Sequence, residues 1–487
     1  MIDGGVGALH EAILALNLFF LAYMAAMQLN QGLLLYLGWR EISEYVKRSA
    51  LRDYETIGAS DLSVPVSIIV PAYNEECVIV ESVRSLLGCE YRGLEVVVVN
   101  DGSSDGTLEA LRDAFRLVED KRVPRTSLPS EPVLATYRSL ADERLVVIDK
   151  VNGGCKADAM NAGLCYARYP LFCATDADTV LERDALPRLV REFQVRPETV
   201  AVGGIVRIIN GSSVSDGHVR EVKTPRNLLV NLQIVEYLRA FLLGRTGWSR
   251  LRALLIISGA FGLFRRELVI AAGGYDKTAL TEDADLVARL HRLCRARDID
   301  YRIGFIADPV CWTEAPASLS VLARQRERWQ RGLVQVLWRY RGMIGRRRYG
   351  ALGLFAMPYF VVFEALGPLV EVLGYTCFAL SLGFGWVSAA SAVAFFVVAI
   401  ALGTAFSLGS LLVEERAFQR YRGWRCFGRL ILAAVLENFL YRQWYALVRV
   451  KACVAMALGR EAVWGEMVRT GFGPSPVPVP SGRPSEP

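Results

Sequence analysis

One long stretch of this chain carries no charged side chain, and this limits what the N-terminal segment can become. It runs from Ala12 to Trp39, and roughly 20 apolar residues are enough for a helix to cross a bilayer. A cleaved secretion signal is the alternative, but no Lys or Arg precedes the stretch, whereas several basic residues follow it. The positive-inside rule therefore predicts a transmembrane helix over residues 1–40, with its N-terminus outside and the next segment in the cytoplasm.

A second group of apolar segments lies in the last third of the chain, and one of them, Val372–Val413, carries no charged residue. Leu352–Val370 and Val372–Val413 can form two spans, joined by an outer loop at the glycine-rich residues 383–386. The following loop is predicted to be cytoplasmic because it is rich in arginine, with Arg416, Arg420, Arg422, Arg425 and Arg429. Charged residues interrupt Leu430–Leu458, which can either span with these residues facing protein or lie in the interface.

Composition agrees with a membrane protein, since 53% of the residues are hydrophobic. The net charge of +6 is modest, and the basic residues cluster near predicted membrane edges, which favours contact with anionic lipid headgroups over nucleic acid. Ten cysteines without a CxxC pair predict reduced thiols, and three histidines argue against a histidine-based zinc site.

Between Val64 and Ile344, β-branched runs alternate with helical patterns. The runs VSIIV, LEVVVVN, RLVVIDK and LFCAT are each followed by a turn and a helical segment. This pattern predicts an α/β fold with buried parallel strands. Residues 121–143 contain three prolines and are predicted to be a surface insertion. We therefore expect a cytoplasmic domain over 41–345, further transmembrane and interface helices over 346–472, and a disordered Pro/Ser-rich tail over 473–487.

Aspartates follow two of these strands, at the edge where parallel sheets bind ligands. Asp176 and Asp178 come after LFCAT, and alternate side chains of an extended segment share a face. Mg²⁺ typically takes one or two carboxylates together with substrate phosphates. The pair can instead form a solvated turn with a helix cap. Asp101, ahead of Gly102, can likewise serve a turn or contact a nucleotide.

Thr281, Glu282 and Asp283 open a helical pattern. An N-cap threonine with acids in the first turn is ordinary helix design. The run also follows the tight turn of residues 273–276 and comes after the paired aspartates, which favours a place in an active site.

The segment from Arg324 to Arg341 is basic and aromatic. It is typical of an amphipathic helix in the membrane interface, whose cations snorkel towards water. Selected side chains of the same helix can still face an active site.

These motifs stand in one order: VSIIVPAYNEE, VVVVNDGSSDGT, GGCKADAMNAG, ATDAD, SGAFGLFRRE, GGYDKTALTEDADL and QRERWQRG. With them, residues 64–345 resemble the processive family-two inverting glycosyltransferases, membrane enzymes that make cellulose, chitin, hyaluronan and poly-N-acetylglucosamine. The resemblance implies a Rossmann-like, nucleotide-sugar-binding domain of the glycosyltransferase A type with transmembrane helices on both sides. PYFVVFEALGP and EAVWGEMVRTGF are also similar to bacterial members. One departure is Cys155, which stands where many relatives run directly from Gly to Lys.

On the donor side, the resemblance implies a role for each matched residue. Glu75 and Asp101 would contact the uridine of a UDP-sugar, and Lys156 would lie near the nucleotide. Asp176 and Asp178 would hold the nucleotide and a Mg²⁺ or Mn²⁺ ion.

On the acceptor side, Asp283 would be the general base that deprotonates the acceptor hydroxyl, with Glu282 beside it. Gln325, Arg328 and Trp329 would bind the pyrophosphate and the growing sugar chain.

The resemblance thus implies a multi-pass synthase of the plasma (inner) membrane that extends a β-linked polysaccharide. A non-processive transferase of the same fold acting on a glycolipid acceptor is the alternative, and the Gln-Arg-x-Arg-Trp run favours the polymerase. A catalytically silent scaffold predicts loss of a key carboxylate, and none is missing. Because few spans are predicted, we expect a homo-oligomer or a small membrane subunit.

Overall fold

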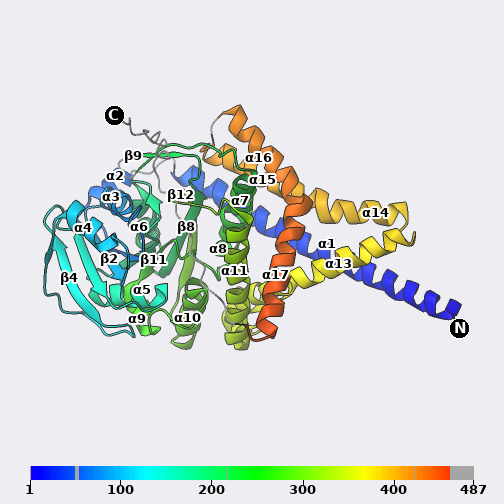
Figure 1. Ribbon diagram of the computed structural model, residues 1–487, viewed down its shortest axis with the longest axis horizontal. Coiled ribbons are helices and arrows are strands. Elements are labelled where there is room, and N and C mark those ends of the chain that lie inside the picture. Colours follow the sequence, from blue (N-terminus) through cyan, green and yellow to red (C-terminus); the bar gives the residue numbers. More distant parts are fainter. Residues whose placement is uncertain (1, 50–53, 216–217, 422, 461–487) are drawn as a thin grey trace, which may run out of the picture.

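The structure, a computed structural model, describes residues 2–49, 54–215, 218–421 and 423–460. The predicted tail and the run EAVWGEMVRTGF lie outside the described residues. A sheet domain occupies one end of the molecule, and helices project from it at the other (Figure 1).

The sheet has ten strands in the order β3-β4-β5-β2-β1-β6-β11-β8-β12-β7. Its strands are β1 (Val66–Ala72), β2 (Leu94–Asp101), β3 (Leu117–Glu119), β4 (Val133–Ser139), β5 (Leu145–Lys150), β6 (Leu171–Thr175), β7 (Val180–Leu181), β8 (Thr199–Ile208), β11 (Phe261–Arg265) and β12 (Arg302–Thr313). A separate hairpin pairs β9 (Ser213–Ser215) with β10 (His218–Glu221).

The central strands are buried on both faces, as their continuous apolar runs predict. Val97 and Val99 of β2 belong to one buried hydrophobic cluster, and Val96 and Val98 belong to another. The helices of this domain are α2 (Tyr54–Ala59), α3 (Ile79–Leu87), α4 (Thr107–Phe115), α5 (Lys156–Tyr166), α6 (Ala185–Val195), α9 (Arg266–Ala271) and α10 (Glu282–Ala296).

The prediction of parallel strands holds for only part of the sheet. β1, β2, β5 and β6 are parallel, but β11 pairs antiparallel with both β6 and β8. Strand β11 follows a helical excursion rather than a simple crossover, so it enters the sheet from the opposite end. An apolar run does not encode strand direction.

The predicted surface insertion also needs correction. Residues 133–139 form β4, which pairs antiparallel with β5 and with β3. The three prolines precede this strand, so they do not remove any of its backbone donors.

The helical part begins with α1 (Ile2–Ser49), and the excursion between β10 and β11 forms α7 (Leu228–Tyr237), the π-helical η1 (Leu238–Arg245) and α8 (Thr246–Arg250). After β12 come α11 (Leu319–Arg339), η2 (Arg341–Met343), η3 (Arg347–Tyr349), η4 (Leu352–Ala356), α12 (Met357–Tyr359), η5 (Phe360–Ala365), α13 (Gly367–Gly383), α14 (Ala389–Phe396), η6 (Val397–Ala401), α15 (Leu402–Ala417), α16 (Trp424–Leu436), η7 (Glu437–Tyr441) and α17 (Arg442–Ala457). In Figure 1, α11 and α17 stand between the sheet and the projecting α1, α13 and α14.

Within the described residues, two helices are long and apolar enough to cross a membrane. They are Glu11–Arg48 and Ala389–Ala417. A third is added if Leu352–Ala365 and Gly367–Gly383, which meet at a bend of 44°, count as one span.

The segment 430–458 is not among these candidate spans. Two of its charged residues face protein, since Glu437 pairs with Arg239 and Arg442 pairs with Glu371, whereas Lys451 is exposed. Helix α17 packs against α11 and α13, and α16 packs against α7, so this segment is held among the other helices.

Candidate active site

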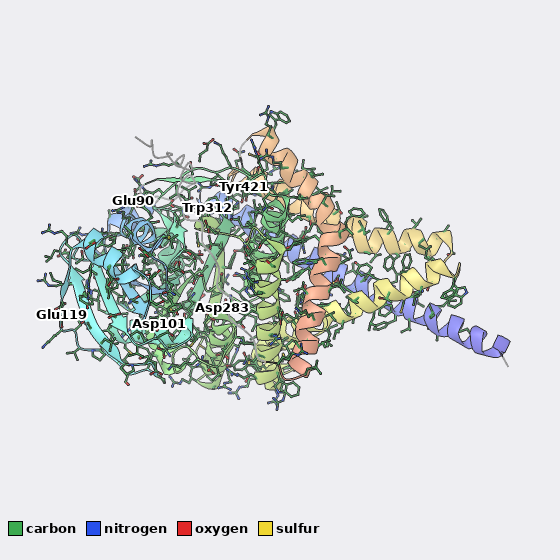
Figure 2. All side chains as sticks on the ribbon, in the orientation of Figure 1. Glu90, Asp101, Glu119, Asp283, Trp312 and Tyr421 are labelled. Carbon is green, nitrogen blue, oxygen red and sulfur yellow. The ribbon has the colours of Figure 1, made fainter. Side chains whose placement is uncertain are left out.

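One cavity of about 910 Å³ gathers the residues singled out from the sequence. It lies between the sheet domain and the helices. All of them line it: Glu75, Asp101, Lys156, Asp176, Asp178, Glu282, Asp283, Gln325, Arg328 and Trp329. Figure 2 shows Asp101 within the sheet domain and Asp283 nearer the helical part. The structure therefore brings together segments that are more than 250 residues apart in the chain.

Sheet topology explains how the donor-side aspartates meet. Asp101 is the last residue of β2, and Asp176 directly follows β6. β1 lies between these two strands and is parallel to both, so all three carboxyl ends reach the same edge.

Lys150, which sequence reasoning missed, fixes Asp101. Its ammonium group is fully buried and forms ion pairs with Asp101 and, at 2.6 Å, with Asp158. The Gly153 N–H also donates to Asp101, at 3.1 Å. Burial alone would raise the pKa of Asp158, but hydrogen bonds from Lys150 and Lys277 hold that pKa below its ordinary value. The sequence gives no signal for Lys150, since Asp158 is brought to it only by the fold.

Lys156 contacts one of the paired aspartates. Its ammonium group forms an ion pair with Asp176 and donates to the Gly259 carbonyl at 2.8 Å. Burial opposes its charge, but Asp176 and Glu282 together raise the pKa of Lys156. Although Cys155 stands between Gly154 and Lys156, Lys156 still lines the cavity, at the first position of α5.

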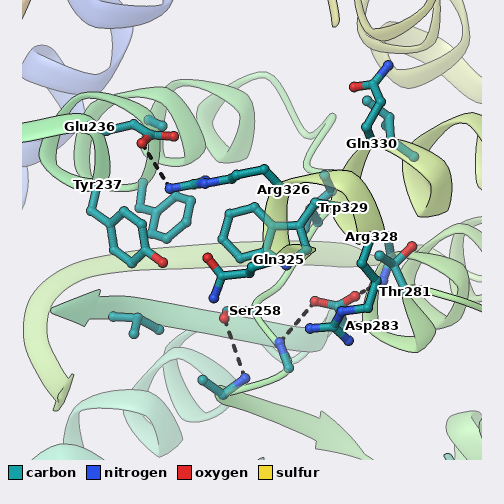
Figure 3. A pocket seen from close by; sticks show the side chains of 18 of the residues that line it. Glu236, Tyr237, Ser258, Thr281, Asp283, Gln325, Arg326, Arg328, Trp329 and Gln330 are labelled. Carbon is teal, nitrogen blue, oxygen red and sulfur yellow. Dashed lines mark hydrogen bonds and ion pairs between the residues drawn. The ribbon is translucent and has the colours of Figure 1, made fainter. Parts of the chain in front are cut away.

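Gly259 marks the point where three charged side chains converge. An ideal Cβ built on it would lie 3.3 Å from Nζ of Lys156, 3.5 Å from Oε1 of Glu282 and 3.7 Å from Oδ2 of Asp283. Oδ2 of Asp283 accepts from the Gly259 N–H at 3.0 Å (Figure 3), and its Oδ1 accepts from the Ala284 N–H at 2.8 Å. Burial raises the pKa of Glu282, although Lys156 and Arg328 oppose the rise.

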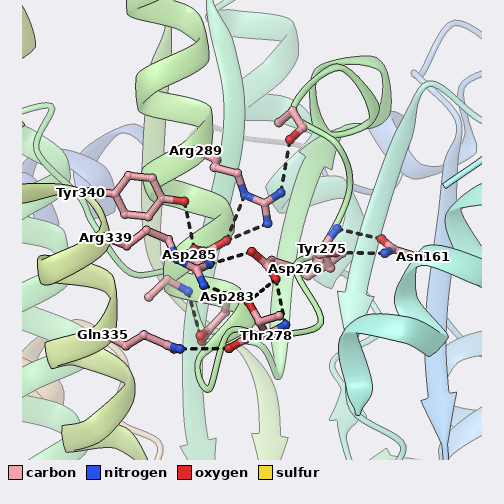
Figure 4. Close-up of polar contacts among 12 residues, drawn as sticks. Asn161, Tyr275, Asp276, Thr278, Asp283, Asp285, Arg289, Gln335, Arg339 and Tyr340 are labelled. Atoms are coloured by element: carbon pink, nitrogen blue, oxygen red, sulfur yellow. Dashed lines mark hydrogen bonds and ion pairs between the residues drawn. The ribbon is translucent and has the colours of Figure 1, made fainter. Parts of the chain in front are cut away.

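The loop that precedes Asp283 is held from two sides (Figure 4). Asn161 exchanges hydrogen bonds with the Tyr275 backbone, at 2.7 and 2.9 Å. Arg339 of α11 pairs with Asp276 at 2.7 Å, and Gln335 accepts from the Leu280 N–H at 2.9 Å. The two glycines of the turn have positive φ values, and a Cβ on Gly274 would lie 2.5 Å from the Asn161 amide oxygen.

Helix α11 carries Gln325, Arg328 and Trp329 into the cavity. Arg326, expected to snorkel, is instead buried and pairs with Glu236 at 2.9 Å. Its guanidinium lies 4.4 Å from the centre of the Trp329 ring (Figure 3). α11 is packed against protein on both sides, because α17 covers the face turned away from the sheet domain.

Beyond Trp329 the cavity continues among α1, η1, α13 and α17, where it is lined by aromatic side chains and ion pairs. The arginines of this part are paired with glutamates: Arg239 with Glu437, Arg326 with Glu236, Arg442 with Glu371 and Arg449 with Glu364.

Arg245 differs from these arginines. Among the described residues it forms no ion pair, its Nη1 is buried without a hydrogen-bond partner, and its guanidinium lies 3.9 Å from the Phe241 ring centre. Burial lowers the pKa of Arg245 to about 10. No motif or pattern in the sequence singles out this residue.

The donor set decides what kind of metal site is feasible. The described residues include no group of three or more His, Cys, Asp or Glu side chains that could hold a metal ion. Asp176 and Asp178 nevertheless offer two carboxylates in the same cavity. This pair fits a hard divalent cation only when phosphate oxygens of a bound nucleotide complete the coordination.

Comparisons with known proteins agree with this geometry. The model of glycosyl transferase family 2 matches residues 67–270, and that of glycosyl transferase family group 2 matches residues 172–408. The poly-beta-1,6-N-acetyl-D-glucosamine synthase of Staphylococcus epidermidis is 30% identical over 274 residues, and that of Staphylococcus aureus is 28% identical over 276 residues. These matches cover 56% of this chain and 56% of each relative, so the chain spans little more than half the length of the relatives it matches.

A solved structure shows the same fold. It is the mannosyltransferase PcManGT from Pyrobaculum calidifontis, in complex with GDP-Man and Mn²⁺. The TM-score is 0.51 at 22% identity, over 87% of this chain and 99% of that one. The mixed α/β sheet is therefore of the glycosyltransferase A type.

Proposed function

This chain is a nucleotide-sugar glycosyltransferase of family two, similar to polysaccharide synthases, and from that premise we propose that it extends a β-linked polysaccharide from a UDP-sugar at a membrane surface. One observation carries the proposal: Lys156, Glu282 and Asp283 converge on Gly259, in the cavity that Trp329 also lines.

On the donor side, Glu75 and Asp101 bind the uridine. The ion pair from buried Lys150 supports this role for Asp101, because it holds the carboxylate in one place. Lys156 lies against Asp176 and is placed to neutralise a diphosphate oxygen. Asp176 and Asp178 would hold Mg²⁺ or Mn²⁺ together with the diphosphate, and the cation would stabilise the charge on the departing UDP.

Asp283 is the general base. It takes the proton of the acceptor hydroxyl while the hydroxyl oxygen bonds to the anomeric carbon of the donor. The bond from that carbon to the diphosphate oxygen breaks, and UDP departs with its electron pair. A single displacement converts an α-linked donor into a β-linked product. Arg328 supplies positive charge for the leaving group, and the buried Glu282 shapes the electrostatics beside the base.

The acceptor chain lies on Trp329 and Gln325. Arg326 positions the indole ring, whose flat face suits the C–H surface of a sugar. The apolar helices Glu11–Arg48 and Ala389–Ala417 support a multi-pass location in the plasma (inner) membrane with the sheet domain in the cytoplasm. With so few candidate spans, we expect a second copy or a small membrane subunit to complete the membrane part.

The test uses the purified full chain with Mn²⁺ or Mg²⁺ and a panel of UDP-sugars, and it reads UDP release and product length together. A long polymer from one donor, abolished in Asp283→Asn, is expected. Asp113→Asn, an exposed position on α4 outside the cavity, is the matched control and keeps full turnover. A single sugar on a lipid would instead establish the glycolipid transferase. Turnover that persists in Asp283→Asn would overturn the assignment of the base.

A further inference from the structure

Seven exposed arginines form a surface outside the cavity, which we call the arginine patch. They come from two segments, one at the end of α10 and one between α11 and η4: Arg292, Arg295, Arg297, Arg341, Arg346, Arg347 and Arg348. None of the seven forms an ion pair with another described residue, and none lines the cavity. They are therefore not explained by the candidate active site.

The fold brings the two segments of the arginine patch together. Arg348 donates from its guanidinium to the Arg295 carbonyl at 3.0 Å. Arg292 lies 5.5 Å from the centre of the Tyr340 ring, at the end of α11. Figure 1 shows α10 beside the lower end of α11. The two segments of the patch are thus in contact, although 44 positions of the sequence separate them at their closest.

The arginine patch carries a large excess of positive charge. Its exposed acidic neighbours in the α10 segment are Asp298 and Asp300, and Asp300 faces Arg252 at 3.8 Å. Seven arginines in one place exceed the net charge of +6 that the whole chain carries. Such a concentration of like charge on a surface is costly unless an anionic partner neutralises it.

The position of the arginine patch indicates which kind of anionic partner neutralises it. Arg348 stands just ahead of Leu352–Ala365, the first half of the bent candidate span. Trp338 is 69% exposed beside the patch, and Arg341 lies 4.9 Å from its ring centre. Arginines next to a span bind anionic headgroups, and tryptophan is enriched at the same level of the bilayer.

We propose that the arginine patch binds anionic phospholipid headgroups of the membrane surface. Helix α10 carries Glu282 and Asp283 in its first turn and the patch at its other end, and Arg339 of α11 pairs with Asp285 at 2.9 Å. Headgroups bound at the patch thus hold the helix that carries the base at a fixed depth beside the bilayer. This second step rests on the proposed function, whereas lipid binding itself does not.

Native mass spectrometry of the delipidated full chain tests lipid binding without any turnover. The chain is titrated with phosphatidylglycerol or phosphatidylcholine, and bound lipids are counted. We expect phosphatidylglycerol to bind preferentially and its affinity to fall at least tenfold in Arg346→Gln/Arg347→Gln/Arg348→Gln, since each headgroup contact contributes roughly fivefold. Arg292→Gln/Arg297→Gln, from the other segment, should weaken binding in the same direction.

The matched control removes three exposed arginines of the sheet domain, on α3, in the loop before β2 and on β4: Arg84→Gln/Arg92→Gln/Arg138→Gln. Figure 1 shows α3, β2 and β4 away from the projecting helices. It should bind phosphatidylglycerol as the wild type does. Equal loss in the control, unchanged binding in both patch variants, or equal binding of phosphatidylcholine would each overturn the proposal. UDP release in nanodiscs then tests the second step: wild-type activity should rise with phosphatidylglycerol content, and the activity of the patch variants should not.

Discussion

Gly332 of α11 lies directly against Thr281, the residue that precedes Glu282 and Asp283. A Cβ on Gly332 would come within 2.3 Å of the Thr281 methyl group and 2.6 Å of its hydroxyl oxygen. The absence of a side chain at this position lets the helix that carries Trp329 approach the loop that carries the base.

Gly332→Ala should therefore lower both stability and turnover. Overpacking of this kind costs about 1–3 kcal/mol, which outweighs the gain of about 1 kcal/mol in helix propensity. Thermal unfolding and UDP release measure the two effects. Gly342→Ala is the matched control, because nothing lies within 4 Å of a Cβ at that position. A Gly332→Ala protein as active and stable as the control would contradict the tight contact.

Lys150→Met should destabilise the protein by about 3–5 kcal/mol, because it leaves Asp101 and Asp158 buried without their cation. UDP affinity should fall with it, as Asp101 loses its fixed position. Adding Asp158→Asn removes one of the two orphaned charges and should recover part of the stability in chemical denaturation. An unchanged free energy of unfolding in Lys150→Met would show that the two carboxylates do not need this ammonium group.

The pH dependence of stability should report Glu282. Its pKa in the folded protein lies above the ordinary value of 4.5, so the folded protein binds more protons than the unfolded chain between these two pKa values. The free energy of unfolding contributed by Glu282 therefore falls as pH rises from 4.5 through the folded pKa. Glu282→Gln should lack this fall when denaturation is measured across the same pH range. Identical pH profiles would argue against the raised pKa.

Arg245→Met should raise the melting temperature, since it removes a buried charge without a carboxylate partner. Turnover should fall as well, because Arg245 lines the cavity. We expect a fall of roughly tenfold to a hundredfold, which corresponds to the loss of one hydrogen bond to a charged group. Arg239→Met is the contrasting variant, because it strands Glu437 and should destabilise the protein. If both variants lose stability alike, Arg245 has a structural role.

Metal binding should depend on the nucleotide. Two carboxylates alone hold a divalent cation weakly, so calorimetry should find tight Mn²⁺ binding only when UDP is present. Chelation by EDTA should abolish UDP release, and Mn²⁺ should restore it. Asp178→Asn should weaken Mn²⁺ binding in the presence of UDP, and tight binding to the nucleotide-free protein would contradict a shared site.

The sequence by itself determined the central strands, the apolar helices and most of the residues that line the candidate site. A continuous β-branched run is apolar on both faces, so it is buried in the sheet that it joins. Asp101 and Asp176 stand at the carboxyl ends of parallel strands, which is where α/β sheets bind ligands. A stretch such as Ala12–Trp39 has few alternatives to an apolar helix.

Only the tertiary structure decided which way β11 runs, that residues 133–139 join the sheet, and that Arg326 is buried against Glu236. It alone also brought Lys150 to Asp158 and Arg348 to Arg295. The physical reason is common to all of these. Strand direction, ion pairing and the clustering of surface charge depend on which distant segments come into contact. Local sequence pattern and secondary-structure propensity do not determine these contacts.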